Sequence, residues 1–457
     1  MADNDLIVVI PGITGSTLRR NGAEVWSSRP TTVLATLATL GRYIGQLQLP
    51  ADIGDRAPED GVEAKELIST LHFIPGLWTP IHGYEMLVRR LRATRASVAC
   101  QQFGDLNPVL FPYDWRLSNR CTARRLKGYA EEALHRWRDC APQNRDAKIT
   151  FVCHSMGGLI ARWYISKEGG ALLTRKMITL GTPYRGAIKA LAVLADEPMP
   201  KLGRFGEHLH RAVLSFPSVH QLLPSYACVN HGGEELEYLV DQTDSVLRSS
   251  LRRDVALFYQ QLEEAESADD NAPTRRHAIV GTRQPTTASA SLINSRYEFS
   301  ELLGHRDLAG DGTVSAASGP KGVPLDDNSI RRVADKHGHL QCNSAALDEV
   351  ESVVRSEPIV VKAGRIEDLS VAMPEILSAG EPVIATMSSA AGRRSVAITV
   401  RDEHGGVVEE VQKVLRNSAV QYRTSALDPG GYTLEVRDVA DSESASGVHS
   451  AFLVWPR

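Results

Sequence analysis

The chain has 457 residues, of which 42% are hydrophobic and 23% charged, an ordinary composition for a globular protein. Because one hydrophobic core rarely grows beyond about 250–300 residues, we expect a large domain and a smaller one. The formal net charge of −4 leaves no basic excess to neutralise phosphates, so nucleic acid is not an expected partner.

The N-terminal segment lacks the features of a secretory signal. Two acidic residues, Asp3 and Asp5, lie near its start, and the apolar run Leu6–Ile10 passes directly into Pro11-Gly12. A signal needs a basic start and a longer apolar region, so we interpret this run as a buried strand. No stretch approaches the roughly 20 apolar residues of a membrane span. These observations predict a cytoplasmic protein.

The six cysteines are widely and irregularly spaced, and no CxxC pair is present. In a large chain without a signal, we expect free thiols. A cysteine zinc site is not expected, and the sequence predicts no metal and no other cofactor.

Strand-like and helix-like segments alternate from residue 5 to residue 357. Strands are expected at Leu6–Ile10, Val109–Phe111, Lys148–Cys153, Lys176–Leu180, Ala278–Val280 and Ile330–Val333, and helices at Thr122–Cys140, Gly157–Lys167 and Asn343–Ser356. This alternation predicts an α/β domain over residues 1–357, with a mostly parallel sheet covered on both faces. Residues 186–275 contain helical pieces without a convincing strand, and we expect them to form a helical cap.

The pattern changes after Glu357 to short alternating strands with turns between them. They are expected at Ile359–Lys362, Pro382–Met387, Ser395–Arg401, Val420–Arg423, Tyr432–Arg437 and Ala451–Val454. Such spacing predicts an Ig-like β-sandwich over residues 358–457. The segment has no catalytic cluster, so we expect it to contact a protein partner or the cap.

The segment Ile149–Arg162 is typical of a nucleophile elbow, in which a serine sits on a strained turn between a strand and a helix. Ser155 is the expected nucleophile, and Gly157 supplies the small residue needed two positions later. Cys153 replaces the usual glycine two positions earlier, and cysteine is small enough to be buried there. The helix that follows directs its positive end at the serine oxygen.

Serine needs a base that is oriented by an acid, and on this fold the order is serine, acid, histidine. Asp311 lies between two glycines and is the expected acid, with Asp307 as the competing candidate. The loop after the last expected strand carries two histidines, His337 and His339, and its pattern alone does not choose the base.

An oxyanion hole needs two backbone N–H groups. The residue after the nucleophile, Met156, provides one. The glycine-containing loop Pro11–Ser16 provides the other, with Ile13 as the expected donor and Thr14 as the alternative. A phosphate-binding loop is disfavoured because the segment lacks the P-loop lysine and the full GxGxxG spacing.

Taken together, these motifs resemble the lecithin:cholesterol acyltransferase family, which includes lysosomal phospholipase A2 and bacterial relatives. The matching segments run in family order: Val8–Gly12 with Gly15-Ser16, Phe111–Arg116, Cys153–Gly158, Thr179–Gly186, Ser215–Ser218 with Leu222–Pro224, and Gly310–Val314. The Pro-Tyr-Asp-Trp-Arg element is rather specific to this family.

The resemblance implies a triad of Ser155, Asp311 and His337, because the family's histidine precedes a Leu or Met by three residues, as His337 precedes Leu340. It also implies oxyanion donors at Ile13 and Met156, a lid over residues 19–60 and a cap after Gly186. Apolar residues at helical spacing in Thr31–Leu49 form a face for the protein core or for transient contact with a membrane surface.

The sequence therefore predicts a serine hydrolase or acyltransferase that acts on lipid acyl esters and resembles phospholipase A. One alternative is a soluble esterase or thioesterase with small acyl substrates. An alternative of another class is an inactive hydrolase-fold scaffold whose β-sandwich binds a partner.

Overall fold

The structure, a computed structural model, describes residues 4–26, 44–69, 71–72, 81–94, 107–195, 202–233, 235–242, 247–268, 274–320, 330–356, 369–390, 393–416, 419–439 and 447–456. The expected strand Ile359–Lys362 and most of the apolar stretch Thr31–Leu49 lie outside these residues. Among the described residues, no helix is both long and apolar enough to cross a membrane.

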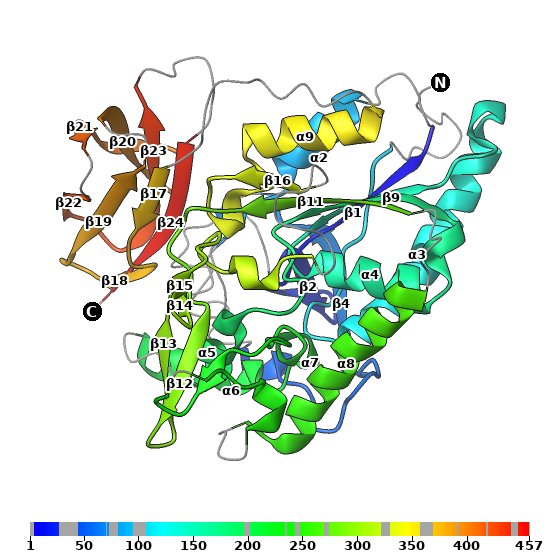
Figure 1. Cartoon of the computed structure of the whole chain (residues 1–457). Coiled ribbons are helices and arrows are strands. Elements are labelled where there is room, and N and C mark those ends of the chain that lie inside the picture. The colour runs from blue at the N-terminus through cyan, green and yellow to red at the C-terminus, as the bar shows by residue number, and fades with distance from the viewer. Residues whose placement is uncertain are drawn as a thin grey trace.

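Within the described residues, a parallel sheet of six strands forms the centre of the first domain (Figure 1), in the order β16-β11-β9-β8-β1-β7. The strands are β1 (Leu6–Ile10), β7 (Val109–Leu110), β8 (Ile149–His154), β9 (Thr174–Leu180), β11 (Arg275–Gly281) and β16 (Ile330–Val333). Each of these strands was expected from the sequence, although several bounds differ by one to three residues.

Helices cover both faces of this sheet, because alternate residues of its strands are apolar on each side. On β1, Leu6 and Val8 belong to one core cluster, and Ile7 and Val9 belong to the other. The helices are α3 (Asn119–Cys140) and α4 (Gly157–Lys167) on the first face, and α2 (Glu85–Thr94) and α9 (Ser344–Arg355) on the second. Figure 1 shows α2 and α9 side by side above the sheet.

A mainly helical region lies between β9 and β11. It contains α5 (Ile188–Ala195), α6 (Gly203–Val213), α7 (Pro217–His220), η5 (Leu239–Asp241) and α8 (Ser249–Ala268). The expectation of no strand here is wrong, because β10 (Val229–Asn230) pairs with β12 (Ser289–Ile293), which in turn pairs with β13 (Arg296–Ser300). The parallel partner of β10 lies far along the chain, so local pattern did not indicate it.

Small elements complete this domain. They are β2 (Ser16–Arg20), β3 (Ala23–Trp26), β4 (Val62–Leu67), β5 (Leu71–His72), β6 (Ile81–His82), β14 (Leu302–Leu303), β15 (Arg306–Asp307), η1 (Ile44–Leu47), η2 (Pro142–Asn144), η3 (Gly170–Leu172), η6 (Ala316–Ser318) and η7 (His337–His339). The described part of the expected lid thus contains β3 and η1, and its Leu47 and Leu49 are buried in the core.

The C-terminal strands form two facing sheets around a separate core, within the residues described. One sheet contains β17 (Leu369–Ala372), β19 (Pro382–Ser389) and β22 (Val420–Ala426). The other contains β18 (Ile376–Ser378), β24 (Gly447–Trp455), β23 (Gly430–Asp438), β20 (Arg394–Asp402) and β21 (Val407–Leu415). The predicted fold class, an α/β hydrolase followed by an all-β domain, is therefore confirmed.

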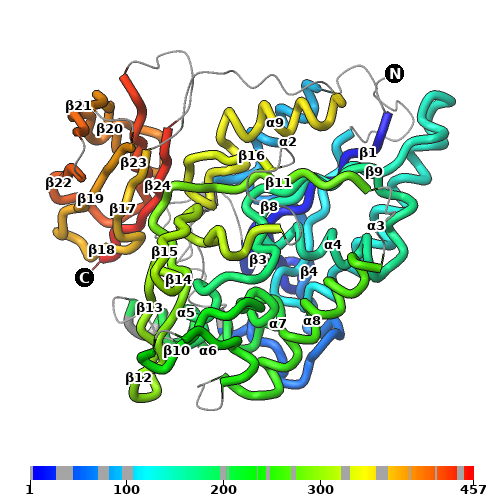
Figure 2. The backbone as a smooth tube through the Cα atoms, in the orientation of Figure 1, coloured from blue at the N-terminus to red at the C-terminus, as the bar shows by residue number. Residues whose placement is uncertain are grey.

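The β-sandwich packs beside the β16 end of the hydrolase sheet (Figure 2). Lys189 Nζ lies 3.0 Å from Glu375 Oε1 across this boundary. The fully buried Gln284 acts there as a strand partner: its side chain donates to the carbonyl of Leu369 at 3.0 Å and accepts from the N–H of Val371 at 3.1 Å. Polar groups of both regions are thus satisfied by each other.

The expectation that the cysteines are free thiols is wrong for Cys140, which is disulfide-bonded. Cys121, Cys153, Cys228 and Cys342 are free. Sequence spacing does not reveal which sulfurs the fold brings together, because disulfide formation depends on the separation of the two residues in space.

Candidate active site

The turn between β8 and α4 holds Ser155 in an unusual backbone conformation. Its φ is 52°, in the left-handed region that most side chains avoid. Two hydrogen bonds hold this turn: the N–H of Ser155 donates to the carbonyl of Leu180 at 2.9 Å, and Thr182 Oγ1 donates to the carbonyl of Ser155 at 2.9 Å. The turn therefore has the strained geometry expected of a nucleophile elbow.

Close packing explains the small residues around the elbow. A Cβ on Gly157 would lie 2.6 Å from the carbonyl oxygens of Ile10 and Pro11, and one on Gly158 would lie 2.2 Å from Thr182 Oγ1. Cys153, which stands where the elbow pattern has glycine, is fully buried in the core. Burial raises the pKa of its thiol well above the ordinary value, so Cys153 is a neutral packing group.

The structure brings His337 to the serine. Its Nε2 lies 2.8 Å from Ser155 Oγ, and its Nδ1 lies 2.7 Å from Asp311 Oδ2. Because the carboxylate can only accept, Nδ1 carries the proton and Nε2 is left to accept from the serine hydroxyl. All three side chains are buried, which strengthens the electrostatic interactions between them.

Asp311 is fixed by its own loop. Its Oδ1 accepts from the N–H groups of Thr313 at 2.9 Å and Val314 at 2.7 Å, which leaves Oδ2 for the histidine. A Cβ on Gly281, at the end of β11, would lie 2.3 Å from Asp311 Cβ, so only glycine permits this approach. The competing Asp307 is exposed and caps a turn by accepting from the N–H of Ala309.

The alternative base, His339, points elsewhere. Its Nδ1 lies 2.6 Å from Asp335 Oδ2, and the carboxylate and imidazole form a second pair beside the first. The two histidines occupy the two ends of η7, with Gly338 between them. The structure therefore places His337, and not His339, against Ser155.

The expected oxyanion loop lies directly over the elbow. A Cβ on Gly12 would lie 2.9 Å from Ser155 Cβ, so the glycine allows the loop to approach the nucleophile. Ile13 and Met156 are both buried, and among the described residues neither backbone N–H donates a hydrogen bond to a protein group. Thr14 has a left-handed φ of 63°, and its carbonyl accepts from Trp26 Nε1.

Sequence reasoning missed a relay that joins the oxyanion loop to the histidine loop. The N–H of Gly12 donates to Tyr84 Oη at 2.8 Å, Tyr84 Oη lies 2.9 Å from His154 Nδ1, and His154 Nε2 lies 3.0 Å from the carbonyl of His337. Since that carbonyl can only accept, Nε2 carries the proton and the tyrosine hydroxyl donates to Nδ1.

Burial and the nearby His337 lower the pKa of His154 to about 3, so its imidazole is neutral at physiological pH. Nothing in the local sequence distinguishes Tyr84 from a core tyrosine, so its role is visible only in the structure.

The Tyr-Asp-Trp-Arg element, residues 113–116, holds the oxyanion loop through hydrogen bonds. Tyr113 donates to the carbonyl of Pro11 at 2.9 Å, and Trp115 Nε1 donates to the carbonyl of Ser16 at 3.2 Å, so both hold the oxyanion loop. The buried Arg116 pairs with Asp114 at 2.7 Å and Asp60 at 2.9 Å. This ion-pair network holds Asp60, at the end of the segment expected to form a lid, against the domain.

Residues 105–314 match the family model of lecithin:cholesterol acyltransferase. The matched segment contains Ser155 and Asp311, and the resemblance that the sequence motifs indicated is confirmed. On this match, the protein is an enzyme of the serine hydrolase or acyltransferase type that acts on acyl esters of lipids.

Among solved structures, the chain is similar to one in the Tle4–Tli4 complex, at 14% identity and a TM-score of 0.51, with 77% of this chain and 98% of that chain covered. This similarity shows the fold. The chain also matches the propeptide form of a Bacillus licheniformis lipase, BlEst2 (9% identity, 98% and 93% covered, TM-score 0.36). Phospholipase PlaB from Legionella pneumophila is a further match (9%, 98% and 89%, 0.33). No curated protein matches the sequence.

Proposed function

We propose that the chain cleaves the acyl ester bond of a phospholipid through a covalent acyl-enzyme on Ser155. The observation that carries the proposal is the continuous contact from Asp311 through His337 to Ser155, with distances of 2.7 Å and 2.8 Å. A nucleophile, a base within hydrogen-bond reach and a group that orients the base are the parts that acyl transfer requires.

In the first step, Ser155 Oγ attacks the ester carbonyl and its proton passes to His337 Nε2. Asp311 accepts from Nδ1–H and stabilises the imidazolium that forms. The N–H groups of Ile13 and Met156 bind the oxyanion, and losing one such donor typically costs about 10²–10³ in rate. His337 then returns the proton to the leaving alcohol oxygen, and the acyl group stays on Ser155.

In the second step, water or an alcohol attacks the acyl-enzyme. His337 Nε2 takes the proton of the attacking hydroxyl, the bond between Ser155 Oγ and the acyl carbon breaks, and Oγ regains a proton. Water gives a free fatty acid, whereas an alcohol gives a new ester. The same triad serves both acceptors, so product identity distinguishes hydrolase from acyltransferase.

The family match supports a lipid substrate, and phospholipase A activity is the specific form that we propose. Transient contact with a membrane surface through Thr31–Leu49 stays a prediction, because most of that stretch lies outside the described residues. A protein partner for the β-sandwich and a cytoplasmic location also stay predictions. The disulfide at Cys140 weighs against the cytoplasmic location, since disulfides are rare in reducing compartments.

The proposal is tested by incubating the full chain with phosphatidylcholine vesicles and, separately, with a soluble short-chain ester. We expect lysophospholipid and fatty acid by mass spectrometry, and faster turnover on vesicles than on the soluble ester. Activity confined to the short-chain ester would instead support a soluble esterase.

Ser155→Ala serves as the mechanistic control, together with labelling by a fluorophosphonate probe. We expect labelling of the wild type at Ser155 and no labelling or turnover by the variant. A folded wild type that neither turns over any acyl ester nor reacts with the probe would favour the scaffold alternative.

A further inference from the structure

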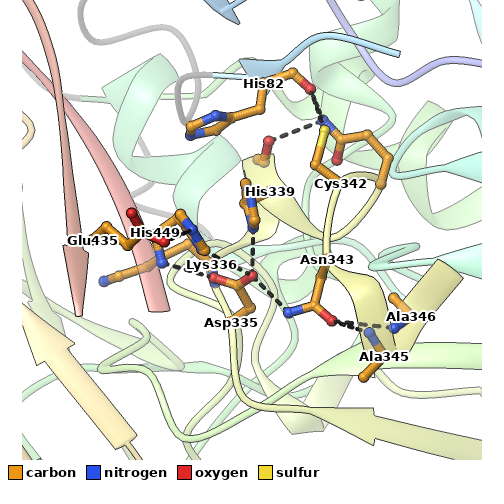
Figure 3. A network of polar contacts seen from close by, with 12 residues as sticks. His82, Asp335, Lys336, His339, Cys342, Asn343, Ala345, Ala346, Glu435 and His449 are labelled. Carbon is orange, nitrogen blue, oxygen red and sulfur yellow. Dashed lines mark hydrogen bonds and ion pairs between the residues drawn. The ribbon is translucent and has the colours of Figure 1, made fainter. Parts of the chain in front are cut away.

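A second polar cluster lies where the β-sandwich meets the loop that carries His337 (Figure 3). Asp335 follows β16, His339 ends η7, and His449 comes from β24 of the sandwich. Each of the three offers one ligand atom, and these atoms all lie within 4.8 Å of one another. Two imidazoles and one carboxylate from two domains therefore converge on one point.

Two imidazole nitrogens in this region are unsatisfied. His449 Nε2 lies 3.0 Å from Glu435 Oε1, but its Nδ1 is buried, has no hydrogen-bond partner among the described residues, and lies 3.9 Å from Asp335 Oδ2. The adjacent His82 also has a buried Nε2 without a partner in the part of the chain described, and its ring packs edge-on against His339.

A buried polar atom without a partner costs about 1–3 kcal/mol, and native structures keep such atoms mainly where water, an ion or function accounts for them. A small cavity of about 30 Å³ borders the cluster, lined by His82, His339 and His449 among others. That volume exceeds the roughly 10–15 Å³ needed for one water molecule. The cavity beside His339 and His449 is therefore large enough to hold one water molecule or one ion.

The geometry points to a divalent metal site formed by Asp335, His339 and His449, with zinc as the best-matched ion. Imidazole nitrogen and carboxylate oxygen are zinc ligands, with bonds of about 2.0–2.2 Å. The 3.9 Å between His449 Nδ1 and Asp335 Oδ2 exceeds by about 0.6 Å the roughly 3.3 Å that separates two ligands of a tetrahedral zinc ion, so a small inward shift lets one ion bind both atoms.

His339 needs a small adjustment to join this site. Its Nδ1 lies 2.6 Å from Asp335 Oδ2, whereas two ligands of a tetrahedral zinc ion lie roughly 3.3 Å apart for bonds of that length. A displacement of the imidazole by less than roughly 1 Å, with loss of the Nδ1 proton to solvent, therefore exchanges the hydrogen bond for metal coordination.

The surrounding groups already orient the ligands in the way that metal sites require. Glu435 accepts from His449 Nε2 and so directs Nδ1 at Asp335, where a metal ion would take the place of the Nδ1 proton. Asn343 Nδ2 donates to Asp335 Oδ2 at 2.9 Å, and the backbone N–H groups of Lys336 and His449 donate to Oδ1 at 2.8 Å and 3.0 Å. Figure 3 shows these groups around the three ligands.

The site is tested by measuring bound metal in the full, untagged chain. The protein is incubated with excess zinc, dialysed, and analysed by inductively coupled plasma mass spectrometry. We expect one zinc ion per chain in the wild type and its loss in His449→Ala. His404→Ala is the matched control, because His404 is an exposed histidine of the same domain, and it keeps the wild-type stoichiometry.

Two outcomes overturn the assignment. One is a folded wild type that retains no zinc. The other is a His449→Ala variant that retains as much zinc as the wild type, as expected if the ion sits at Ser155 and His337. Should the variant fail to fold, calorimetric titration of the chelated wild type with zinc decides the matter, since the absence of saturable one-to-one binding also overturns the site. Cobalt substitution adds a spectroscopic readout: tetrahedral coordination gives strong visible bands, which His449→Ala lacks.

Discussion

The loop His337–His339 carries two carboxylate–imidazole pairs that are almost identical in isolation. In one, His337 Nδ1 lies 2.7 Å from Asp311, and in the other His339 Nδ1 lies 2.6 Å from Asp335. Each pair is buried, and Gly338 alone separates the two histidines. They differ in what the rest of the imidazole contacts: His337 reaches Ser155, whereas His339 stacks on His449 of the β-sandwich.

The two carboxylate–imidazole pairs show that the further group in contact with the imidazole determines what the pair can do. Beside a strained serine, the imidazole is poised to accept a proton. Beside a second imidazole with an unsatisfied nitrogen, it is poised to hold an ion or to join two domains. The two pairs also differ in origin, because Asp311 and Ser155 come from the hydrolase fold, whereas His449 lies 114 residues beyond Asp335.

The largest expected effect comes from removing the base. His337→Ala should lower kcat for acyl-ester hydrolysis by on the order of 10⁴–10⁶, because among the described residues only the His337 imidazole contacts Ser155 Oγ. His339→Ala should retain activity at least about a hundredfold above that of His337→Ala. Steady-state kinetics on the same ester measure both. Equal losses in the two variants would break the comparison.

Replacing the acid comes next. Asp311→Asn should lower kcat by roughly 10⁴, since the amide can donate to Nδ1 and so favour the wrong tautomer of His337. Asp307→Asn is the control, because Asp307 is exposed and its carboxylate accepts from the N–H of Ala309, and it should match the wild type. A loss that follows position 307 instead would reassign the acid.

A smaller effect concerns the pH dependence of stability. Because burial, with a contribution from His337, lowers the pKa of His154 to about 3, the unfolded chain binds a proton at pH 3–6.5 that the folded chain does not. The free energy of unfolding should therefore fall as the pH drops through this window, by up to about 1.4 kcal/mol per unit from this group.

The comparison with His154→Gln isolates this contribution, because glutamine keeps a donor but does not titrate. Denaturant unfolding between pH 4.5 and 7.5 should give a shallower slope for His154→Gln. His135→Gln, at an exposed histidine, should keep the wild-type slope. Parallel slopes for all three proteins would mean that His154 titrates normally in the fold.

The last prediction tests how much the contact between the two domains contributes to stability. Gln284→Ala removes the side chain that pairs with Leu369 and Val371, and it should cost about 1–3 kcal/mol because one buried N–H and one C=O lose their partner. Gln412→Ala on the exposed face of β21 should stay within about 0.5 kcal/mol of the wild type. Thermal unfolding measures both, and an unchanged Tm for Gln284→Ala would show that the boundary is held by other contacts.

The sequence predicted those features that depend on local spacing. A strand, Ser155 and two glycines are contiguous, and the requirement for small residues at a tight turn made the elbow recognisable. The choice between His337 and His339 came from family resemblance, because the immediate sequence offers two histidines around one glycine.

Features that depend on distant partners were not predicted. The Tyr84–His154 relay, the disulfide at Cys140, the pairing of β10 with β12, and the approach of His449 to Asp335 all join segments separated by many residues. No local periodicity encodes such encounters, since they arise when whole sheets and domains pack. The expectation of a metal-free chain rested on the lack of a cysteine motif, which says nothing about ligands drawn from two domains.

The relay through Tyr84 and His154 constrains how the catalytic centre can deform. It ties the backbone of Gly12 to the backbone of His337 through a single line of three hydrogen bonds. A displacement of one loop therefore lengthens a contact of the other, so that stabilisation of the oxyanion and alignment of the base are lost or gained in concert. An inhibitor that displaces the oxyanion loop by even a fraction of an ångström would also misalign the His337 imidazole, although it does not contact that ring.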